Sequence, residues 1–166
     1  MTNRRNFLTG GAAVAGVAVL AGGYRIFKGE TETYIGNFEV TLTEAQWRER
    51  LTEAEFAVLR EEATERPYTS ELLEEDRVGI YTCAGCDQDL YPSETKYDSA
   101  TGWPSFWAPL DNAVATKPDT KLLYTRTEVH CDRCGGHLGH IFDDGPQPTG
   151  KRHCLNGIAL NFRPTA

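Results

Sequence analysis

Two short stretches between residues 44 and 61 place apolar side chains at helical spacing. Trp47 and Leu51 lie four positions apart, Phe56 and Leu59 lie three apart, and most of the residues between them are Glu, Arg or Ala. This pattern predicts two short helices that pack their aromatic side chains into a core. The polar segment that follows Pro67 leads out of the helical region.

Each predicted helix begins with the signature of a capping box. Thr43 is followed three residues later by Gln46, and Thr52 is followed by Glu55. In such a box the threonine hydroxyl and the side chain three positions on bond the free N–H groups of the first helical turn. Both helices should therefore start at these threonines.

From residue 77 onward the apolar runs are short, β-branched or aromatic, and are separated by Gly, Pro and Asp. No long helical period separates them, so parallel β-α-β units are not expected and the strands should pair antiparallel. The fold class is mainly β with short N-terminal helices. The candidate strands are 78–81, 113–115, 122–124, 127–129, 138–142 and 158–162.

The first 29 residues differ in composition from the rest of the chain. Arg4 and Arg5 precede Phe7-Leu8 and an uncharged, Ala/Gly-rich run from Gly10 to Gly23. This leader resembles a twin-arginine export signal, and its run is shorter than the ~20 apolar residues of a membrane span. The sequence thus predicts an exported, periplasmic protein, with an uncleaved N-terminal membrane anchor as the alternative.

The remaining chain is one acidic domain, with residues 38–163 as its predicted extent. All 24 Asp and Glu residues but only 13 of the 17 Lys and Arg residues lie after Gly29, which gives a balance of −11. Phosphate recognition needs clustered cations, so nucleic acid is not an expected partner, and contact with a membrane is expected only through the leader. The domain is expected to be a monomer.

Four of the five cysteines form two CxxC pairs, Cys83 with Cys86 and Cys131 with Cys134, with 44 residues between the pairs. Two such turns brought together by strand pairing supply four sulfurs for a tetrahedral Zn²⁺ with no open coordination position. The pattern predicts one structural Zn²⁺ per chain. Disulfides or a thioredoxin-like redox motif are the alternatives, although the β-α-β context of that motif is missing.

The fifth cysteine, Cys154, lies in the part of the chain that is richest in reactive side chains. On a strand, Arg152, Cys154 and Asn156 project from one face, and a cation two positions away favours the reactive thiolate. If that strand pairs with the one ending near Phe142, the candidate site also gains side chains from the earlier strand. These are His137, His140 and Asp144.

A Gly-x-Pro bend carries a further candidate, Trp103 in the run Gly102-Trp103-Pro104-Ser105-Phe106. Such a tryptophan is commonly a core residue. Held at the surface, it offers a flat apolar wall for a methyl or thioether group.

Taken together, these motifs resemble the methionine sulfoxide reductase B family. The resemblance covers residues 38–163 and includes Thr64-Glu65-Arg66-Pro67 beside the cysteine, tryptophan and histidine motifs. It implies a fold of two antiparallel sheets and a peptide-methionine (R)-S-oxide reductase. The substrate would be the R epimer of oxidised methionine in proteins or peptides, and the reductant a thioredoxin-like protein or a small thiol.

The resemblance also implies a role for each matched side chain. Cys154 would attack the sulfoxide sulfur and become a sulfenic acid, while His140 and His137 would position or protonate the sulfoxide oxygen. Asp144, Arg152 and Asn156 would support the polar network, and Trp103 would pack on the substrate methyl group.

Three positions depart from the family pattern. Many members carry a resolving cysteine where this chain has Thr101, which predicts that an external thiol resets Cys154. Gly157 replaces a common Ser and His153 a common Tyr, so bonding around the site is expected to differ. Two other functions stay open, a zinc-stapled β module that binds peptides without catalysis and a periplasmic metal-handling protein.

Overall fold

The computed structural model of the protein describes residues 38–165, and the predicted export leader lies outside them. The prediction of export therefore stays a prediction. Within the described range, no helix has both the length and the apolar character that a membrane crossing requires.

Two helices open the described part of the chain, α1 (Glu44–Arg50) and α2 (Glu53–Glu61). Both capping boxes are present with reciprocal bonds at Thr43 and Thr52, so the predicted helix starts are confirmed. Helix α2 ends at Glu61, before Pro67, and the next residue, Glu62, takes a left-handed conformation. The predicted apolar faces are buried, with Trp47 and Leu59 almost fully covered.

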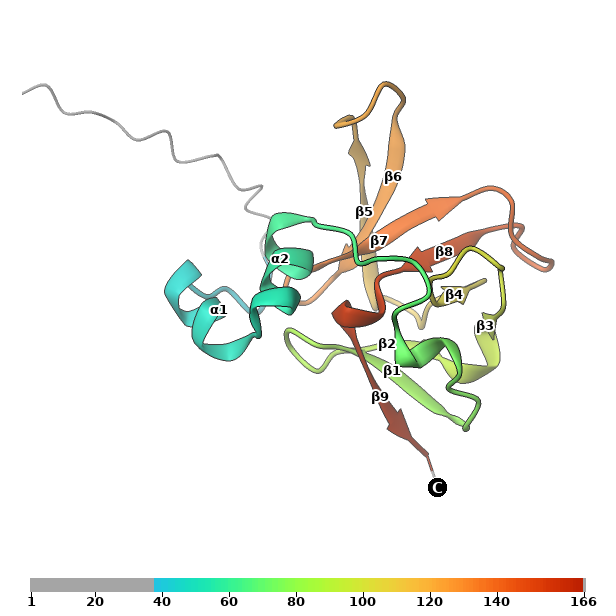
Figure 1. Cartoon of the computed structure of the whole chain (residues 1–166), viewed down its shortest axis with the longest axis horizontal. Coiled ribbons are helices and arrows are strands. Elements are labelled where there is room, and N and C mark those ends of the chain that lie inside the picture. The colour runs from blue at the N-terminus through green and yellow to red at the C-terminus, as the bar shows by residue number, and fades with distance from the viewer. Residues whose placement is uncertain (1–37, 166) are drawn as a thin grey trace, which may run out of the picture. The chain divides into compact units, whose positions relative to one another are not determined.

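The rest of the chain forms two antiparallel sheets, as predicted (Figure 1). The smaller sheet has the order β2-β1-β9, with β1 (Gly79–Cys83), β2 (Asp89–Pro92) and β9 (Leu160–Pro164). The larger has the order β3-β4-β8-β7-β6-β5. Its strands are β3 (Lys96–Tyr97), β4 (Ser105–Phe106), β5 (Val114–Asp119), β6 (Arg126–Cys131), β7 (His137–Phe142) and β8 (Arg152–Leu155). Three single-turn helices are η1 (Glu71–Leu73), η2 (Ser93–Thr95) and η3 (Gly157–Ala159).

The strands predicted from the sequence pattern were wrong or incomplete at several places. Residues 122–124 form bends in the turn between β5 and β6, where they face solvent, so their apolar character reflects no strand. Strand β9 begins at Leu160, because the two residues before it belong to η3. Strands β2, β3 and β4 were missed because two to four residues are too few to display an alternating pattern.

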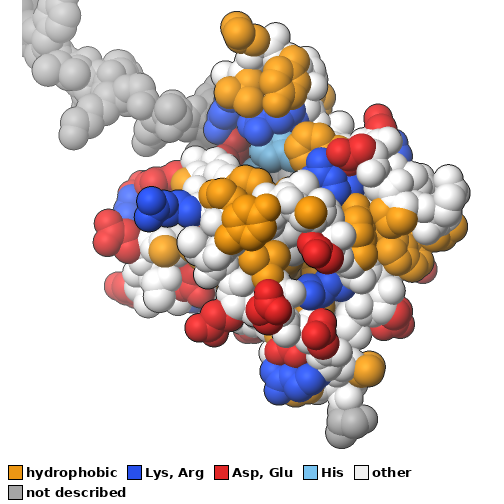
Figure 2. Space-filling model, turned by 45° about the vertical axis from the view of Figure 1, so that its right-hand side comes forward, with side chains coloured by type: hydrophobic (Ala, Val, Ile, Leu, Met, Phe, Trp, Pro, Cys, Tyr) orange, Lys and Arg blue, Asp and Glu red, His pale blue; other side chains and the backbone are white. Residues whose placement is uncertain are grey.

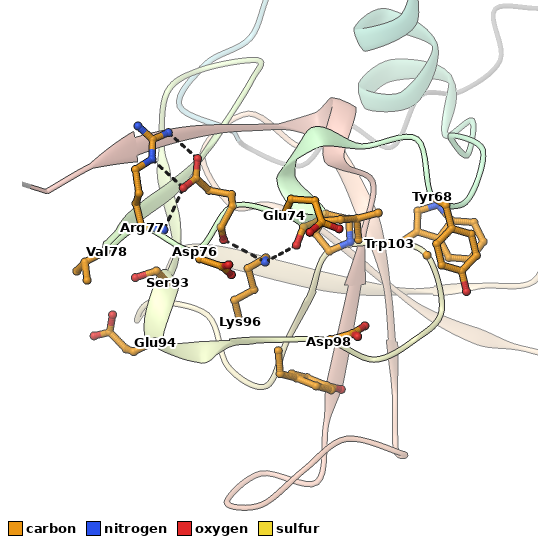
Figure 3. A pocket seen from close by; sticks show the side chains of 15 residues that line it. Tyr68, Glu74, Asp76, Arg77, Val78, Ser93, Glu94, Lys96, Asp98 and Trp103 are labelled. Carbon is orange, nitrogen blue, oxygen red and sulfur yellow. Dashed lines mark hydrogen bonds and ion pairs between the residues drawn. The ribbon is translucent and has the colours of Figure 1, made fainter.

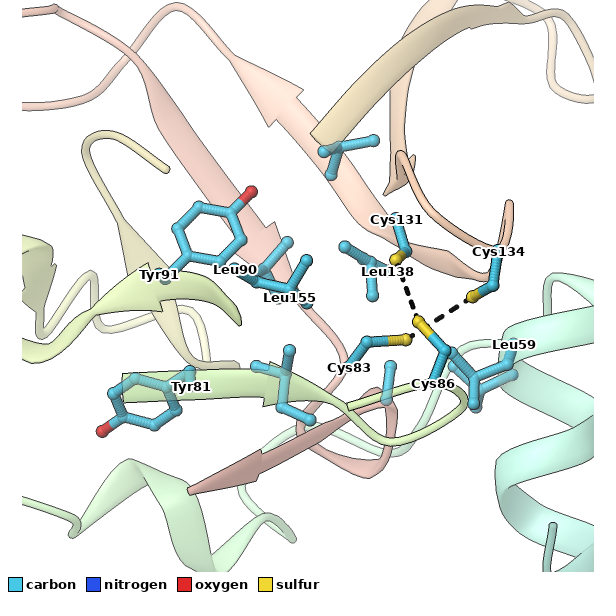
Figure 4. Close-up of a cluster of buried hydrophobic side chains, with 14 of the residues drawn as sticks. Leu59, Tyr81, Cys83, Cys86, Leu90, Tyr91, Cys131, Cys134, Leu138 and Leu155 are labelled. Atoms are coloured by element: carbon cyan, nitrogen blue, oxygen red, sulfur yellow. Dashed lines mark hydrogen bonds between the residues drawn. The ribbon is translucent and has the colours of Figure 1, made fainter. Parts of the chain in front are cut away.

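The core lies between the two sheets, as Figure 4 shows. Tyr81 and Leu90 from the smaller sheet and Leu138 and Leu155 from the larger one have no exposed surface. Burying each of these side chains contributes about 1.5–3 kcal/mol. The core fixes β7 and β8 side by side at the centre of the larger sheet, and these strands carry most of the predicted site.

Candidate active site and metal site

The four cysteines of the CxxC pairs converge at one end of the core. Cys83 ends β1 and Cys86 lies in the turn that leads to β2, whereas Cys131 ends β6 and Cys134 lies in the turn that leads to β7. All four are buried, and their Sγ atoms lie within 4.8 Å of one another (Figure 4). The site therefore joins a hairpin of the smaller sheet to a hairpin of the larger one.

The distances within this cluster fit a tetrahedral metal. The Sγ–Sγ distance is 3.7 Å for Cys83 and Cys134 and 3.5 Å for Cys86 and Cys131. Four sulfurs at the ~2.3 Å bond length of Zn²⁺ would be about 3.8 Å apart. Interactions among the four sulfurs lower the pKa of Cys86 and Cys134 and raise that of Cys83 and Cys131. A bound cation would favour the thiolate at all four. None of the four forms a disulfide.

A β-bulge places the two predicted histidines on one face of β7. Side chains three positions apart on a regular strand face opposite sides. Here Val129 opposes Gly139 and His130 opposes His137, so β7 has one extra residue at this point. The rings of His137 and His140 consequently meet edge to face with centroids 5.4 Å apart.

Cys154 lies directly opposite His140 in the pairing of β7 with β8, and opposite Ser105 of β4 on the other side. Gly139 permits this close approach, because a Cβ there would lie 2.0 Å from the Cys154 carbonyl oxygen. The predicted pairing of the two site strands is thus confirmed.

The Cys154 thiol borders a small hollow of about 130 Å³. It is lined by Thr64, Trp103, Arg126, Gly139, His140, Phe142, Cys154, Leu155 and Asn156. Four predicted site residues, Trp103, His140, Cys154 and Asn156, thus share one cavity. Its mixture of aromatic and polar walls suits a short side chain with one polar atom.

Burial, more than charge, sets the acidity of the thiol. Desolvation raises the pKa of Cys154, and the opposing effects of the Thr101 hydroxyl and the Arg152 guanidinium are smaller. The sequence predicted that Arg152 favours the thiolate. Its effect has that sign, yet it does not lower the pKa below the ordinary value.

Both predicted site histidines, His137 and His140, have a carboxylate partner that the sequence did not predict. His140 Nε2 lies 2.7 Å from Asp119 Oδ2, and Arg126 contacts the same oxygen at 2.5 Å. Burial lowers the pKa of His140, opposed by its hydrogen bond to Asp119. The imidazole is therefore neutral near pH 7, with its orientation fixed by Asp119.

The partner of His137 is Glu128, whose Oε1 lies 3.0 Å from His137 Nδ1. Lys117 contacts the other carboxylate oxygen at 2.9 Å and continues to Glu62 at the same distance. Burial raises the pKa of Glu128, but the bonds from His137 and Lys117 outweigh it and the net pKa is lowered. A buried ionised carboxylate thus supports the inner histidine.

Asp144 holds Arg152 and contacts neither histidine. The carboxylate accepts two bonds from the guanidinium, Nε to Oδ1 at 2.8 Å and Nη2 to Oδ2 at 2.9 Å. The guanidinium carbon also lies 4.4 Å from the centre of the Phe142 ring. Arg152 is thereby fixed beside the thiol, since paired contacts restrict a guanidinium more than one contact would.

Glu65 organises the other wall of the hollow, and its part was not predicted beyond its place in a motif. Its carbonyl accepts a bond from the Trp103 indole at 3.2 Å, and its N–H donates to the Asn156 amide oxygen at 3.0 Å. Its buried carboxylate accepts the N–H groups of Gly157 and Ile158. Trp103, half-buried, is therefore a wall of the hollow that the backbone at Glu65 orients.

Local contacts show how the fold accommodates His153 and Gly157, the residues at two of the positions that depart from the family pattern. His153 points away from the hollow, where Tyr91 contacts its Nδ1 at 2.9 Å and burial lowers its pKa to about 4. Gly157 packs against Ser70, since a Cβ at Gly157 would lie 1.9 Å from Ser70 Oγ. Ser70 thus already occupies the space that a side chain at position 157 would need.

We therefore expect Gly157→Ser to lower the free energy of unfolding by about 1–3 kcal/mol, the usual cost of overpacking. The double variant Gly157→Ser/Ser70→Gly should recover most of the loss, because it frees the contested space. Urea unfolding of the two variants and of Ser70→Gly alone measures this coupling. Equal losses for Gly157→Ser in both backgrounds would show that the two positions do not compete.

A second hollow, of about 610 Å³, lies beside the first (Figure 3). Trp103 borders both hollows and so separates them. Five of its fifteen lining residues carry a carboxylate and two carry a cation. The Lys96 ammonium donates to the carbonyls of Leu73 and Glu75 at 2.9 and 3.1 Å. This polar hollow contains no cysteine or histidine.

The protein thus has two antiparallel sheets joined by a cluster of four cysteines that could hold a metal ion, and a separate thiol that shares a hollow with a histidine and a tryptophan. The chain belongs to the SelR domain family, whose model matches residues 51–164. This confirms the family that the motifs indicated.

Several relatives carry the name "Peptide methionine sulfoxide reductase MsrB". The protein of Leifsonia xyli subsp. xyli is 48% identical over 131 residues, which are 78% of this chain and 94% of the relative. That of Methanosarcina barkeri is 48% identical over 125 residues, 75% of this chain and 88% of the relative. That of Hahella chejuensis is 46% identical over 125 residues, 75% of this chain and 90% of the relative.

Proposed function

We propose that the protein reduces the R epimer of methionine sulfoxide in polypeptides to methionine, with Cys154 as the nucleophile. The observation that carries this proposal is the hollow in which the Cys154 thiol meets His140 and the Trp103 wall. The names of the relatives support the same reaction. A peptide-binding module without catalysis would need the wall but not the paired thiol and imidazole, so it is not favoured.

In the reaction, the sulfoxide methyl group packs on the Trp103 indole and the sulfoxide oxygen faces His140. The Cys154 thiolate attacks the sulfoxide sulfur while the imidazole, oriented by Asp119, donates a proton to the oxygen. This attack forms a bond between the two sulfurs. The S–O bond and the new S–S bond then break as the OH group moves to Cys154, which becomes a sulfenic acid, and methionine leaves with its sulfur reduced by two electrons. His137, fixed by Glu128, supports the position of His140.

Zn²⁺ is the metal that the four-cysteine site fits, with Cys83, Cys86, Cys131 and Cys134 as its ligands. A bound Zn²⁺ would supply structural cross-linking, because four sulfurs leave no coordination position for a substrate. The cysteines join two hairpins and take no part in the chemistry at Cys154.

Resetting the sulfenic acid requires two external thiols or one dithiol. These return Cys154 to the thiol, form one disulfide between themselves and release water. At the position of the resolving cysteine stands Thr101, whose Oγ1 lies 3.9 Å from Cys154 Sγ and 2.8 Å from Ser99 Oγ. Hydroxyl groups, not a second free thiol, thus surround the nucleophile.

The experiment that tests this proposal is the variant Thr101→Cys. After one turnover without reductant, the parent should have released one methionine and should carry one sulfenic acid, on Cys154. The variant should instead hold a disulfide between positions 101 and 154, because the new thiol is near enough to attack. Mass spectrometry after dimedone treatment separates the two products. An intramolecular disulfide in the parent would contradict reset by an external thiol.

The pH dependence follows from the opposite pKa shifts of the reacting pair. Burial raises the pKa of Cys154 above about 9 and lowers that of His140 below about 6.5, so both groups are neutral between these values. Thiolate and imidazolium arise by proton transfer within the pair, so the population of the reacting form does not change over this range. Rates fall only below the pKa of His140 and above that of Cys154.

Single-turnover kcat/KM should accordingly be flat from about pH 6.5 to pH 8.5. The variant Asp119→Asn should shift the acid limb to lower pH, because it removes the charge that opposes the lowered pKa of His140. Rapid-quench measurement of methionine across this range tests both statements. A rate that climbs tenfold over this range would instead indicate a thiol that titrates within it.

A further inference from the structure

The turn between β5 and β6, residues 120–125, displays three consecutive apolar side chains to solvent. Leu122 and Tyr124 are 48% and 62% exposed, and Leu123 is fully exposed. We call these three residues the apolar tip. Single exposed apolar residues are ordinary, whereas a contiguous group marks a surface that binds something apolar.

The backbone that carries the apolar tip is held in place on both sides. Asp119 and Arg126 form the last pair of the β5–β6 ladder and also an ion pair. Asp119 Oδ1 accepts the N–H of Lys121 at 3.0 Å, and the Lys121 ammonium contacts Glu62. The tip therefore projects from a fixed base.

That base is also the rim of the catalytic hollow. Asp119 orients His140, and Arg126 lines the hollow together with Cys154. The β5–β6 turn forms the upper end of the described part in Figure 1, and in Figure 2 this end carries apolar side chains directly above basic and histidine side chains. A polypeptide whose side chain fills the hollow would therefore pass beside the base of the turn that carries the tip.

The hollow itself is too small for a whole ligand. Its volume of about 130 Å³ compares with roughly 300–1,000 Å³ for typical small-molecule sites. It admits one side chain, and the polypeptide that carries this side chain must lie on the surrounding surface. Methionine is itself a core residue, so the neighbours of an oxidised methionine in an unfolded chain are often apolar.

We propose that the apolar tip binds apolar residues flanking methionine sulfoxide in unfolded polypeptide substrates. This inference rests on the proposed function and deepens it, because it selects polypeptides with apolar flanks over the free amino acid. The tip acts on substrate affinity alone and contributes no group to the reaction at Cys154.

The test compares the full-length protein with the variant Leu122→Ser/Leu123→Ser/Tyr124→Ser, using dithiothreitol as reductant. Val78→Ser is the matched control, since Val78 is 69% exposed and lies outside the tip. The three substrates are N-acetyl-methionine R-sulfoxide and two heptapeptides, whose oxidised methionine is flanked by Leu and Phe or by Ser and Gly. Circular dichroism verifies that each variant is folded.

The parent and Val78→Ser should prefer the apolar-flanked peptide by about tenfold in kcat/KM. The tip variant should lose this preference through a higher KM while it reduces the N-acetyl compound at the parent rate. No preference in the parent, or an unchanged preference in the tip variant, would overturn the proposal. The assay is repeated with a thioredoxin-like protein as reductant and in the presence of lipid vesicles, and a tip-variant defect confined to either of these conditions would also overturn the proposal. Failure of every protein to reduce the N-acetyl compound would instead refute the proposed function.

Discussion

Replacing Cys154 by serine is expected to lower the rate of methionine sulfoxide reduction by about 10⁴-fold or more. A serine hydroxyl is a far weaker nucleophile at pH 7 and cannot accept the oxygen as a sulfenic acid. The loss should appear in kcat with little change in KM, because the Trp103 wall and the histidines remain. The measurement is steady-state turnover of the R epimer with dithiothreitol.

Thr101→Ser is the matched control for this prediction. It changes a neighbour that contacts the same sulfur at 3.9 Å while keeping the hydroxyl group, so its activity should stay within a few-fold of the parent. Cys154→Ser should also retain the parent's thermal stability, since the two side chains differ little in size. Turnover by Cys154→Ser at more than a hundredth of the parent rate would remove Cys154 from the proposed chemistry.

The second large effect concerns the metal site. Cys134→Ser is expected to release Zn²⁺ and to lower the free energy of unfolding by at least ~4 kcal/mol. Serine is a poor zinc ligand, and the cross-link between a hairpin of each sheet would be lost. The remaining three buried sulfurs would also face one another without a shared cation.

Metal analysis and thermal unfolding measure this effect. The parent should contain one Zn²⁺ per chain through dialysis against a weak chelator, and Cys154→Ser should contain the same amount. A strong chelator should reduce the stability of the parent toward that of Cys134→Ser. A metal-free parent with unchanged stability, or disulfides within the CxxC pairs, would contradict a structural zinc site.

Local chemistry in the sequence was enough to predict much of this fold. The capping boxes at Thr43 and Thr52 use residues three positions apart, and both helices start where these boxes indicate. The two CxxC pairs likewise carry their own geometry, because each turn directs its two sulfurs toward one point. By contrast, Leu123 has the character of a strand residue and yet faces solvent in a turn.

The residues of the candidate site could be predicted only where several of them lie close together in one sequence motif. Cys154, Arg152 and Asn156 follow from strand alternation, and His140 follows from the pairing of two strands. Nothing in the sequence near Asp119 links it to His140, because the register across three strands creates that contact. Asp119 lies at the end of a strand and before an apolar turn, and this position indicates a role at the site only once the pairing of β5, β6 and β7 is known.

The shared face of His137 and His140 was expected, but its cause was not. Two residues three apart on a strand face opposite sides unless the strand bulges, and the bulge depends on how β7 meets β6. The interaction of Ser70 with Gly157 is likewise set by the fold, since 86 residues separate the two positions. Tertiary contacts therefore decide which substitutions near the site are tolerated.

The central claim is that Cys154 takes the oxygen from methionine R-sulfoxide and depends on an external thiol for its return. It is tested most directly by one turnover of the reduced full-length protein with excess R or S sulfoxide and no reductant. We expect one methionine per chain from the R epimer, a mass increase of about 16 Da on the peptide containing Cys154, and no product from the S epimer. Equal product from both epimers, or methionine formed without modification of Cys154, would contradict it.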